Sequence, residues 1–349
     1  MLPWPRRNSS SHLCSVTEAA PLTEITELTT ALGMLVADLT AGMSTRPPAL
    51  RNVDDATWER LVTSFHSGEH RAHFVSAFEN GAAFLHANDA LREREPRRVE
   101  WKGPHRAPGE DLIPTDIRID HVYQVSCKYD SRIMANSGPA RLFDRLLADK
   151  TRTRTDWFHA VAPDEHQAFY AAARARVGHA LPDSVTDLTA TDRQILRNSL
   201  RPRRLPEPMQ EPWTTLCEAV ASRSSARWRA QLTSANAKLR MLWRLLRVGD
   251  APYFLLGTDG STPLRLRVAS AWDWAQEYEL RSFDVAPRPA GQPEVAWNAV
   301  TRHRATGHEI QAEGLVEIRW SHGRFSGAPE AKIKLTTPLE ETPGYFALT

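Results

Sequence analysis

The spacing of apolar residues changes along this chain, and that change constrains the fold more than any other feature of the sequence. In the N-terminal part, Ile25, Leu28 and Leu32 are spaced as on one face of an amphipathic helix. After Gly249 the apolar and polar residues alternate, as in Leu264-Arg-Leu-Arg-Val268, which is typical of a half-buried antiparallel strand. Helical and strand patterns in separate stretches predict an α+β (mixed α/β) protein.

These patterns divide the chain into four segments. We expect a flexible segment at 1–22, a helical region with an α/β hairpin at 23–150, a helical domain at 151–249 and a β-rich domain at 250–349. A chain of 349 residues is long enough for two or three compact cores. The expected helices are 23–39, 54–65, 71–94, 139–148, 192–200 and 224–247, and the expected strands are 99–101, 252–256, 264–268, 277–280, 295–297, 316–320 and 331–335.

Composition limits the classes of function. No apolar run is long enough for a transmembrane helix, and the N-terminus lacks the apolar stretch of a secretory signal, so we expect no membrane partner. Cys14, Cys127 and Cys217 form no C-x-x-C pair, which argues against a cysteine zinc site and indicates a reducing, cytoplasmic compartment. The net charge of +2 does not by itself predict nucleic-acid binding, although the basic residues are mainly arginine.

Residues 114–128 form the pattern with the clearest chemical meaning. Because successive side chains of a strand point to opposite faces, Asp116, Arg118 and Asp120 share one face of a first strand. On a second strand, Ser126 and Lys128 share a face in the same way. A tight turn that begins near Asp120 would place Asp116 roughly opposite Ser126, with Lys128 close by. The pattern therefore predicts a β-hairpin with one polar, ionisable face.

This hairpin resembles the core of the PD-(D/E)XK nuclease superfamily, in which a Pro-Asp dipeptide precedes an acidic-x-Lys tripeptide on the next strand. Pro114-Thr-Asp116 and Ser126-Cys-Lys128 stand at the corresponding places. The resemblance implies that Asp116 binds Mg²⁺ or Mn²⁺ and that Lys128 orients the attacking water. Oxygen ligands suit Mg²⁺, and such a metal stabilises charge on the scissile phosphate. It also implies an upstream helical glutamate, for which Glu79 is best placed.

Two departures from the family pattern matter. Ser126 stands where an acidic residue is expected, and one extra residue separates Pro114 from Asp116. Asp111 or Asp120 would then have to supply the second carboxylate to the metal. The alternative is that Asp116 and Lys128 form an ordinary cross-strand ion pair, which stabilises a fold by less than about 1 kcal/mol.

A second predicted hairpin, at residues 316–334, has a similar arrangement. Glu330-Ala-Lys332 is an acidic-x-Lys tripeptide, and a turn centred near Gly323 would place Glu317 opposite Glu330. Glu317, Glu330 and Lys332 are therefore alternative catalytic residues, although an edge strand that exposes Glu and Lys to water has the same pattern. The loop between the strands contains His322 and Arg324, which offer donors for a phosphate group.

Further candidates for nucleic-acid contact are Arg118 on the first hairpin, Arg132 and Asn136 after it, and Lys332 on the second. Asn136 has another interpretation, because either Asn136 or Ser137 could cap the helix expected at 139–148. The first functional hypothesis is a Mg²⁺-dependent endonuclease of restriction or defence type, which acts on nucleic acid, with DNA as the expected substrate. The second is a non-catalytic nucleic-acid-binding or scaffold subunit, with a protein partner or a second copy of the chain.

Overall fold

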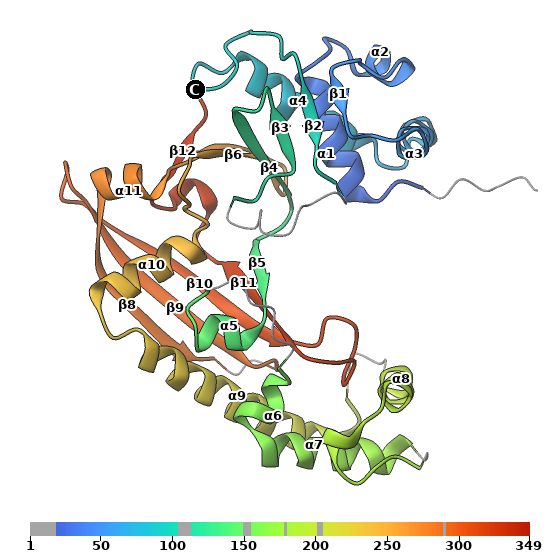
Figure 1. Cartoon of the computed structure of the whole chain (residues 1–349), viewed down its shortest axis with the longest axis vertical. Helices are drawn as coiled ribbons and strands as arrows, with labels where there is room; N and C mark the ends of the chain where they lie inside the picture. The colour runs from blue at the N-terminus through green and yellow to red at the C-terminus, as the bar shows by residue number, and fades with distance from the viewer. Residues whose placement is uncertain (1–18, 104–112, 149–154, 178–179, 201–204, 289–290) are drawn as a thin grey trace, which may run out of the picture. The chain divides into compact units, whose positions relative to one another are not determined.

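The computed structural model describes residues 19–103, 113–148, 155–177, 180–200, 205–288 and 291–349. It confirms the mixed α+β class, with eleven α-helices and twelve β-strands in these ranges (Figure 1). The chain divides into two compact units. The first consists of Met1–His105 and Asp116–Tyr123, and the second of Arg106–Thr115 and Gln124–Thr349. The second unit therefore includes both of the segments expected at 151–249 and 250–349.

The first unit is mainly helical. Its core is the pair α1 and α4, which approach closely at Gly33 and Gly81. The close approach requires glycine, because a Cβ atom at either position would collide with the backbone of the opposite helix. Strand β2 pairs in parallel with β1 and antiparallel with β3. The helices are α1 (Leu22–Gly33), α2 (Leu39–Ser44), α3 (Asp55–Ser67) and α4 (Arg71–His86), and the strands are β1 (Leu50–Arg51), β2 (Val99–Trp101) and β3 (Ile117–Ile119).

The second unit contains two groups of strands. In the first group β4 pairs in parallel with β6, and β6 and β12 both pair antiparallel with β7. The second group is a five-stranded antiparallel sheet with the order β5-β11-β10-β9-β8. The strands are β4 (Tyr123–Tyr129), β5 (Ile133–Ser137), β6 (Tyr253–Asp259), β7 (Thr262–Val268), β8 (Tyr278–Pro287), β9 (Glu294–His303), β10 (Glu309–Arg319), β11 (Glu330–Leu335) and β12 (Tyr345–Ala347).

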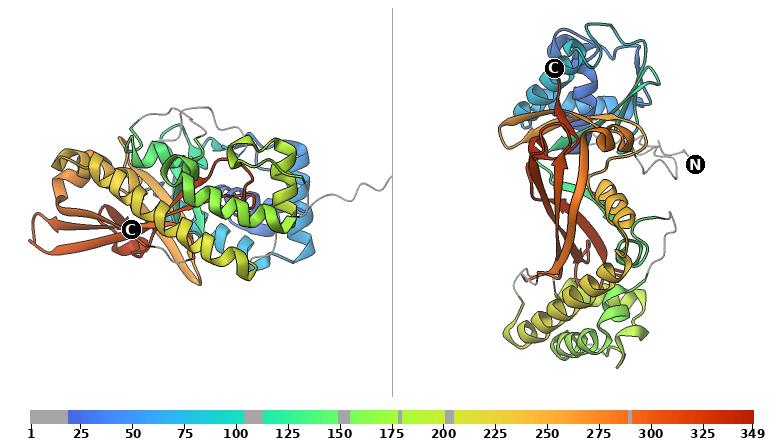
Figure 2. Two further views of the ribbon diagram at one scale, coloured as in Figure 1. Left: turned by 90° about the horizontal axis from the view of Figure 1, so that it is seen from below. Right: turned by 90° about the vertical axis from the view of Figure 1, so that its left-hand side faces the viewer.

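Helices cover one face of the five-stranded sheet. Figures 1 and 2 show α9 and α10 on this face, where α9 contacts β8 and β9. The packing is aromatic, since Phe283 meets Trp228 of α9 edge-on and stacks on Trp297. The helices of this unit are α5 (Pro139–Phe143), α6 (Trp157–Val161), α7 (Pro163–Val177), α8 (Ala190–Ser199), α9 (Glu207–Gln231), α10 (Ala235–Leu245) and α11 (Ala271–Glu277).

Several local predictions are confirmed and two are wrong. Helix α3 lies where a helix was expected at 54–65, and Asp54 caps it, since the Asp54 side chain accepts a hydrogen bond of 2.7 Å from the Thr57 N–H. The single helix expected at 224–247 is two helices, because Ser234 caps a new helix with a 3.1 Å bond from the Ala237 N–H. Asn136 does not cap α5, whose N-cap is Gly138; it lies on strand β5. No helix in the described ranges is both long and apolar enough to cross a membrane.

Candidate functional site

The residues predicted for the first nuclease site are divided between the two units. Asp116 belongs to the first unit and is buried, and its backbone carbonyl accepts a 2.8 Å hydrogen bond from the Lys102 N–H. Ser126 and Lys128 belong to the second unit, on β4. The Lys128 ammonium donates a hydrogen bond to the carbonyl of Ile133. Convergence of Asp116 with Lys128 therefore stays a prediction.

Asp120 is held within the first unit by three donors. Its carboxylate accepts bonds of 2.9 Å from the backbone N–H groups of Arg97 and Arg98, and it pairs with Arg94. Burial raises the pKa of Asp120, but the Arg94 hydrogen bond and the Arg98 and Arg97 N–H groups outweigh burial and lower the pKa overall. The turn that follows is as predicted, since Asp120 and His121 have positive φ angles of 48° and 62°. Asp120 thus fastens this turn to the chain that leads into β2.

Arg118 is neutralised by a residue that sequence reasoning missed. Glu100 is 4% exposed on β2, directly across from Arg118 on β3, and its Oε2 atom lies 2.7 Å from Arg118 Nε. Arg98 contacts the other oxygen at 2.8 Å. The Arg118 hydrogen bond lowers the pKa of Glu100, burial opposes it, and Arg98 lowers it further. No short motif marks Glu100; only the register of β2 against β3 brings it to Arg118.

The other predicted contacts of this region are scattered. Glu79 is exposed on α4. Asp111 lies outside the described residues. Arg132 pairs with Asp259 at 2.9 Å, so part of its charge is neutralised by a neighbouring carboxylate. Asn136 is exposed on β5, where its Cα pairs with that of Lys332 on β11.

The second predicted hairpin exists, with a register that differs from the expected one by two residues. Glu317 is opposite Lys332, and Glu330 is opposite Arg319, whereas Glu317 was expected opposite Glu330. A shift by an even number keeps the same side chains on one face, so the polar face is preserved. The sheet continues this face onto β9, where Glu294 is opposite Glu317.

Glu317 is the centre of an ionic cluster on this face. It is 5% exposed; Lys334 Nζ lies 2.6 Å from its Oε2 atom and Arg319 Nη1 lies 3.3 Å from Oε1. The Lys334 contact is an ion pair by distance, although its angles do not satisfy a hydrogen bond to Oε2. Burial raises the pKa of the neighbouring Glu294, Arg288 opposes that shift, and the Glu317 charge adds to it. The cluster fixes Arg319 at the end of β10.

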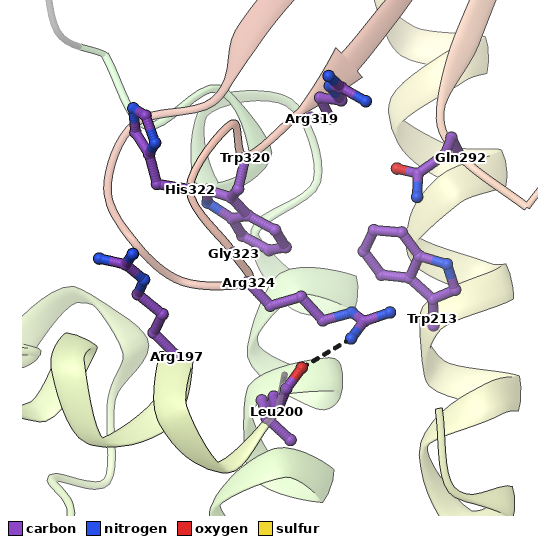
Figure 3. Close-up of a pocket in the computed structure, with 9 residues that line it drawn as sticks. All are labelled: Arg197, Leu200, Trp213, Gln292, Arg319, Trp320, His322, Gly323 and Arg324. Atoms are coloured by element: carbon purple, nitrogen blue, oxygen red, sulfur yellow. Dashed lines mark hydrogen bonds between the residues drawn. The ribbon is translucent and has the colours of Figure 1, made fainter. Parts of the chain in front are cut away.

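Arg319 lies at the edge of a pocket of about 460 Å³ in the second unit (Figure 3). Among the described residues, four with basic side chains line it: Arg197 at the end of α8, Arg319 at the end of β10, and His322 and Arg324 in the loop between β10 and β11. Among the described lining residues none carries a carboxylate. The remaining lining residues are Leu200, Trp213, Gln292, Trp320 and Gly323.

Buried aromatic contacts hold the loop that forms one wall of this pocket. Phe325 is fully buried, with a positive φ of 61°, and it stacks on Phe169 and His166 of α7. The Phe325 carbonyl accepts a 3.2 Å bond from Arg193. Gly323 has a φ of +102°, and a Cβ there would come within 3.0 Å of the Arg197 side chain. The loop is thereby set close against α8.

The electrostatics of the pocket favour an anion. Arg324 donates a 2.9 Å hydrogen bond to the Leu200 carbonyl, and burial lowers the pKa of its guanidinium. Arg319 Nε is buried and finds no hydrogen-bond acceptor among the described residues. Three arginines and a histidine without an acidic lining residue form a cationic pocket, and guanidinium groups match phosphate oxygens in pairs.

Sequence reasoning found only half of the basic residues in this pocket. His322 and Arg324 were predicted to contact phosphate, and both line it. Arg197 and Arg319 were missed. Arg197 reads as an ordinary polar residue of an amphipathic helix, and only the tertiary fold brings it to Gly323. The sequence around Arg319 is also that of an arginine which faces solvent from a strand, so it gives no sign of a pocket.

Binding of Mg²⁺ or Mn²⁺ stays a prediction, since Asp111, one of the expected ligands, lies outside the described residues. Within the described ranges, no three His, Cys, Asp or Glu side chains are grouped so as to hold a metal. The carboxylates of Asp120 and Glu317 are already engaged by arginine or lysine, so neither is offered to a metal as a bare oxygen ligand. We therefore derive no chemical step through a metal.

Comparison with known proteins gives no further guide. No family model matches the chain, and neither a curated protein nor a solved structure matches it. The resemblance to the PD-(D/E)XK superfamily therefore depends on the short motifs of residues 114–128 alone.

Proposed function

We propose that this protein binds nucleic acid through phosphate groups and that the cationic pocket of the second unit is the contact site. The observation that supports this proposal is the meeting of Arg197, Arg319, His322 and Arg324 from separate segments in one pocket, without a lining carboxylate among the described residues. Elsewhere in the chain Arg118 and Arg132 pair with Glu100 and Asp259, and within the pocket Arg319 pairs with Glu317, which lies outside the lining.

The nearly neutral net charge agrees with binding at a local site rather than along a whole basic surface. With a net charge of +2, the chain offers little long-range attraction to a polyanion. The affinity then has to come from a few short contacts, each of which displaces a counterion from the nucleic acid. A mutation of one contact arginine is expected to have a large effect under these conditions.

The test is a binding titration with single-stranded DNA, duplex DNA and RNA in the presence of EDTA. Arg197→Gln should weaken binding about tenfold or more, because a charge-assisted hydrogen bond contributes about 1.5–3 kcal/mol. Arg281→Gln is the matched control: it removes the same charge from β8, where Arg281 pairs with Glu279 outside the pocket lining. Equal affinities of the two variants for every nucleic acid would contradict the proposal.

Phosphodiester cleavage by Asp116 and Lys128 is a separate prediction. Phosphate binding at the pocket does not require it, because none of its residues lines the pocket. Repeating the titration with Mg²⁺ or Mn²⁺ and inspecting the product length tests cleavage on the same samples.

A further inference from the structure

We infer that the pocket accepts a terminal phosphate monoester of a nucleic acid, rather than a phosphodiester within the strand. This inference rests on the proposed function, because it assumes that nucleic acid is the ligand. It concerns which phosphate of the strand the pocket recognises, and it predicts that recognition is independent of base sequence.

The first argument is the amount of positive charge. Three arginine side chains and His322 line the pocket, and none of the described lining residues is acidic. A phosphodiester carries one negative charge, whereas a phosphate monoester carries about −1.5 to −2 at pH 7 and presents three strong acceptor oxygens. The monoester therefore matches the available donors and charge better than a phosphate inside the strand.

The second argument is the size of the site. Proteins that bind single strands without regard to sequence use a long groove that follows the backbone over several nucleotides. This pocket measures about 460 Å³, which is within the range of about 300–1,000 Å³ typical of small-ligand sites. Figure 3 shows Arg197 and His322 on one side and Trp213 and Gln292 on the other, with the Arg324 side chain extending between them. Such a compartment suits the end of a strand better than a strand that passes through.

The third argument concerns what the pocket offers to a base. Trp213 and Trp320 are each 8% exposed, and their N–H groups donate to the carbonyls of Gly291 and Gly327 at 2.9 and 2.8 Å. The two rings thus give an apolar floor but no free indole donor. Among the described lining residues, Gln292 and His322 have side chains that can both donate and accept hydrogen bonds. The lining therefore offers mainly guanidinium donors, which match phosphate oxygens in pairs.

The fourth argument is the state of Arg319. Glu317 and the end of β10 fix its position, and its Nε atom is buried without an acceptor in the described part of the chain. A buried donor without an acceptor destabilises a fold unless a ligand satisfies it. A terminal phosphate oxygen at this edge of the pocket would supply the acceptor once the Arg319 side chain turns Nε toward it. Glu317 would act as a positioning residue for Arg319.

The test uses fluorescence polarisation with oligonucleotides that carry an internal label and differ only at their ends. One set has a 5′-phosphate, one a 3′-phosphate and one only hydroxyl ends, each in two unrelated base sequences. We expect one phosphorylated end to bind at least tenfold more tightly than the hydroxyl ends in both sequences. Arg197→Gln should abolish this difference, and Arg281→Gln should preserve it.

The outcomes separate this inference from the proposed function. If phosphorylated and hydroxyl ends bind equally and Arg197→Gln weakens both, phosphate binding at the pocket stands and end recognition is overturned. If no oligonucleotide binds, both proposals are overturned. A competition assay with a labelled nucleotide tests whether a free nucleoside monophosphate binds. If it binds while oligonucleotides do not, the pocket recognises a phosphate monoester on a small molecule, and the nucleic-acid assignment is overturned.

Discussion

His166 offers the most quantitative prediction, because it is a fully buried histidine in an aromatic environment. It lies on α7 between Phe158 and Phe325, with the Trp320 ring centroid 6.0 Å from its own. Neither ring nitrogen finds a hydrogen-bond partner among the described residues. Burial lowers the pKa of His166 to about 4, while Asp156 opposes the shift and His159 and Arg193 add to it.

The magnitude follows from the difference between the folded and unfolded chains. In the unfolded chain His166 titrates near its usual pKa of 6.5, and in the folded chain it stays neutral down to a pKa of about 4. Above pH 6.5 His166 is neutral in both the folded and the unfolded chain, so its titration does not change the free energy of unfolding there. As the pH falls from 6.5 to about 4, only the unfolded chain gains a proton, and the free energy of unfolding decreases by about 3 kcal/mol.

The assay is urea unfolding of the wild type and of His166→Leu between pH 7 and pH 4.5. The leucine has nearly the volume of histidine and no polar atom to leave unpaired, so we expect His166→Leu to be at least as stable as the wild type at pH 7. At pH 5 the variant should be more stable than the wild type by about a further 2 kcal/mol. His308→Leu, at an exposed histidine in the same unit, is the control and should keep the wild-type pH dependence.

Two results would refute this reasoning about His166. One is a pH dependence of His166→Leu that matches the wild type, which would mean that His166 titrates normally in the folded chain. The other is a loss of more than about 1 kcal/mol at pH 7, which would mean that its ring nitrogens have hydrogen-bond partners that stabilise the fold.

Three further predictions concern single residues. Asp120→Ala should lower the free energy of unfolding by about 2 kcal/mol, because it leaves two backbone donors unpaired. The wild type should lose this stabilisation only as the pH falls through the lowered pKa of Asp120. Lys334→Met should cost about 2 kcal/mol in thermal unfolding, since it strips an ion-pair partner from buried Glu317, whereas Lys332→Met should cost under about 1 kcal/mol. If Mg²⁺-dependent cleavage of plasmid DNA is detected, Lys128→Ala should abolish it; cleavage that survives would exclude Lys128 from the reaction.

Several strands after residue 250 could be predicted because they follow the alternation of a half-buried sheet, and β6 because it is a short apolar run. All six expected strands exist, several of them longer than expected, as β10 shows. The exact register of β10 against β11 could not be predicted, since it depends on the loop between them. That loop is fixed by Trp320 and Phe325 in the aromatic cluster around α7, which no local pattern reveals.

The candidate site could be predicted only in part for a related reason. His322 and Arg324 stand out in a loop rich in glycine and basic residues, and sequence reasoning selected them. Arg197 lies 122 positions before Arg319, and only tertiary packing brings them to one pocket. The break between α9 and α10 was likewise hidden, because Leu232 and Leu239 extend the apolar stripe across the cap at Ser234.

The most direct test of phosphate binding at the pocket is the salt dependence of nucleic-acid affinity. The dissociation constant of a 5′-phosphorylated single strand is measured from 50 to 300 mM salt for the wild type, Arg197→Gln and Arg281→Gln. If Arg197 contacts a phosphate, its replacement should reduce the slope of log affinity against log salt by about one, while Arg281→Gln leaves the slope unchanged. Identical slopes for all three proteins would contradict the assignment of the pocket as the phosphate site.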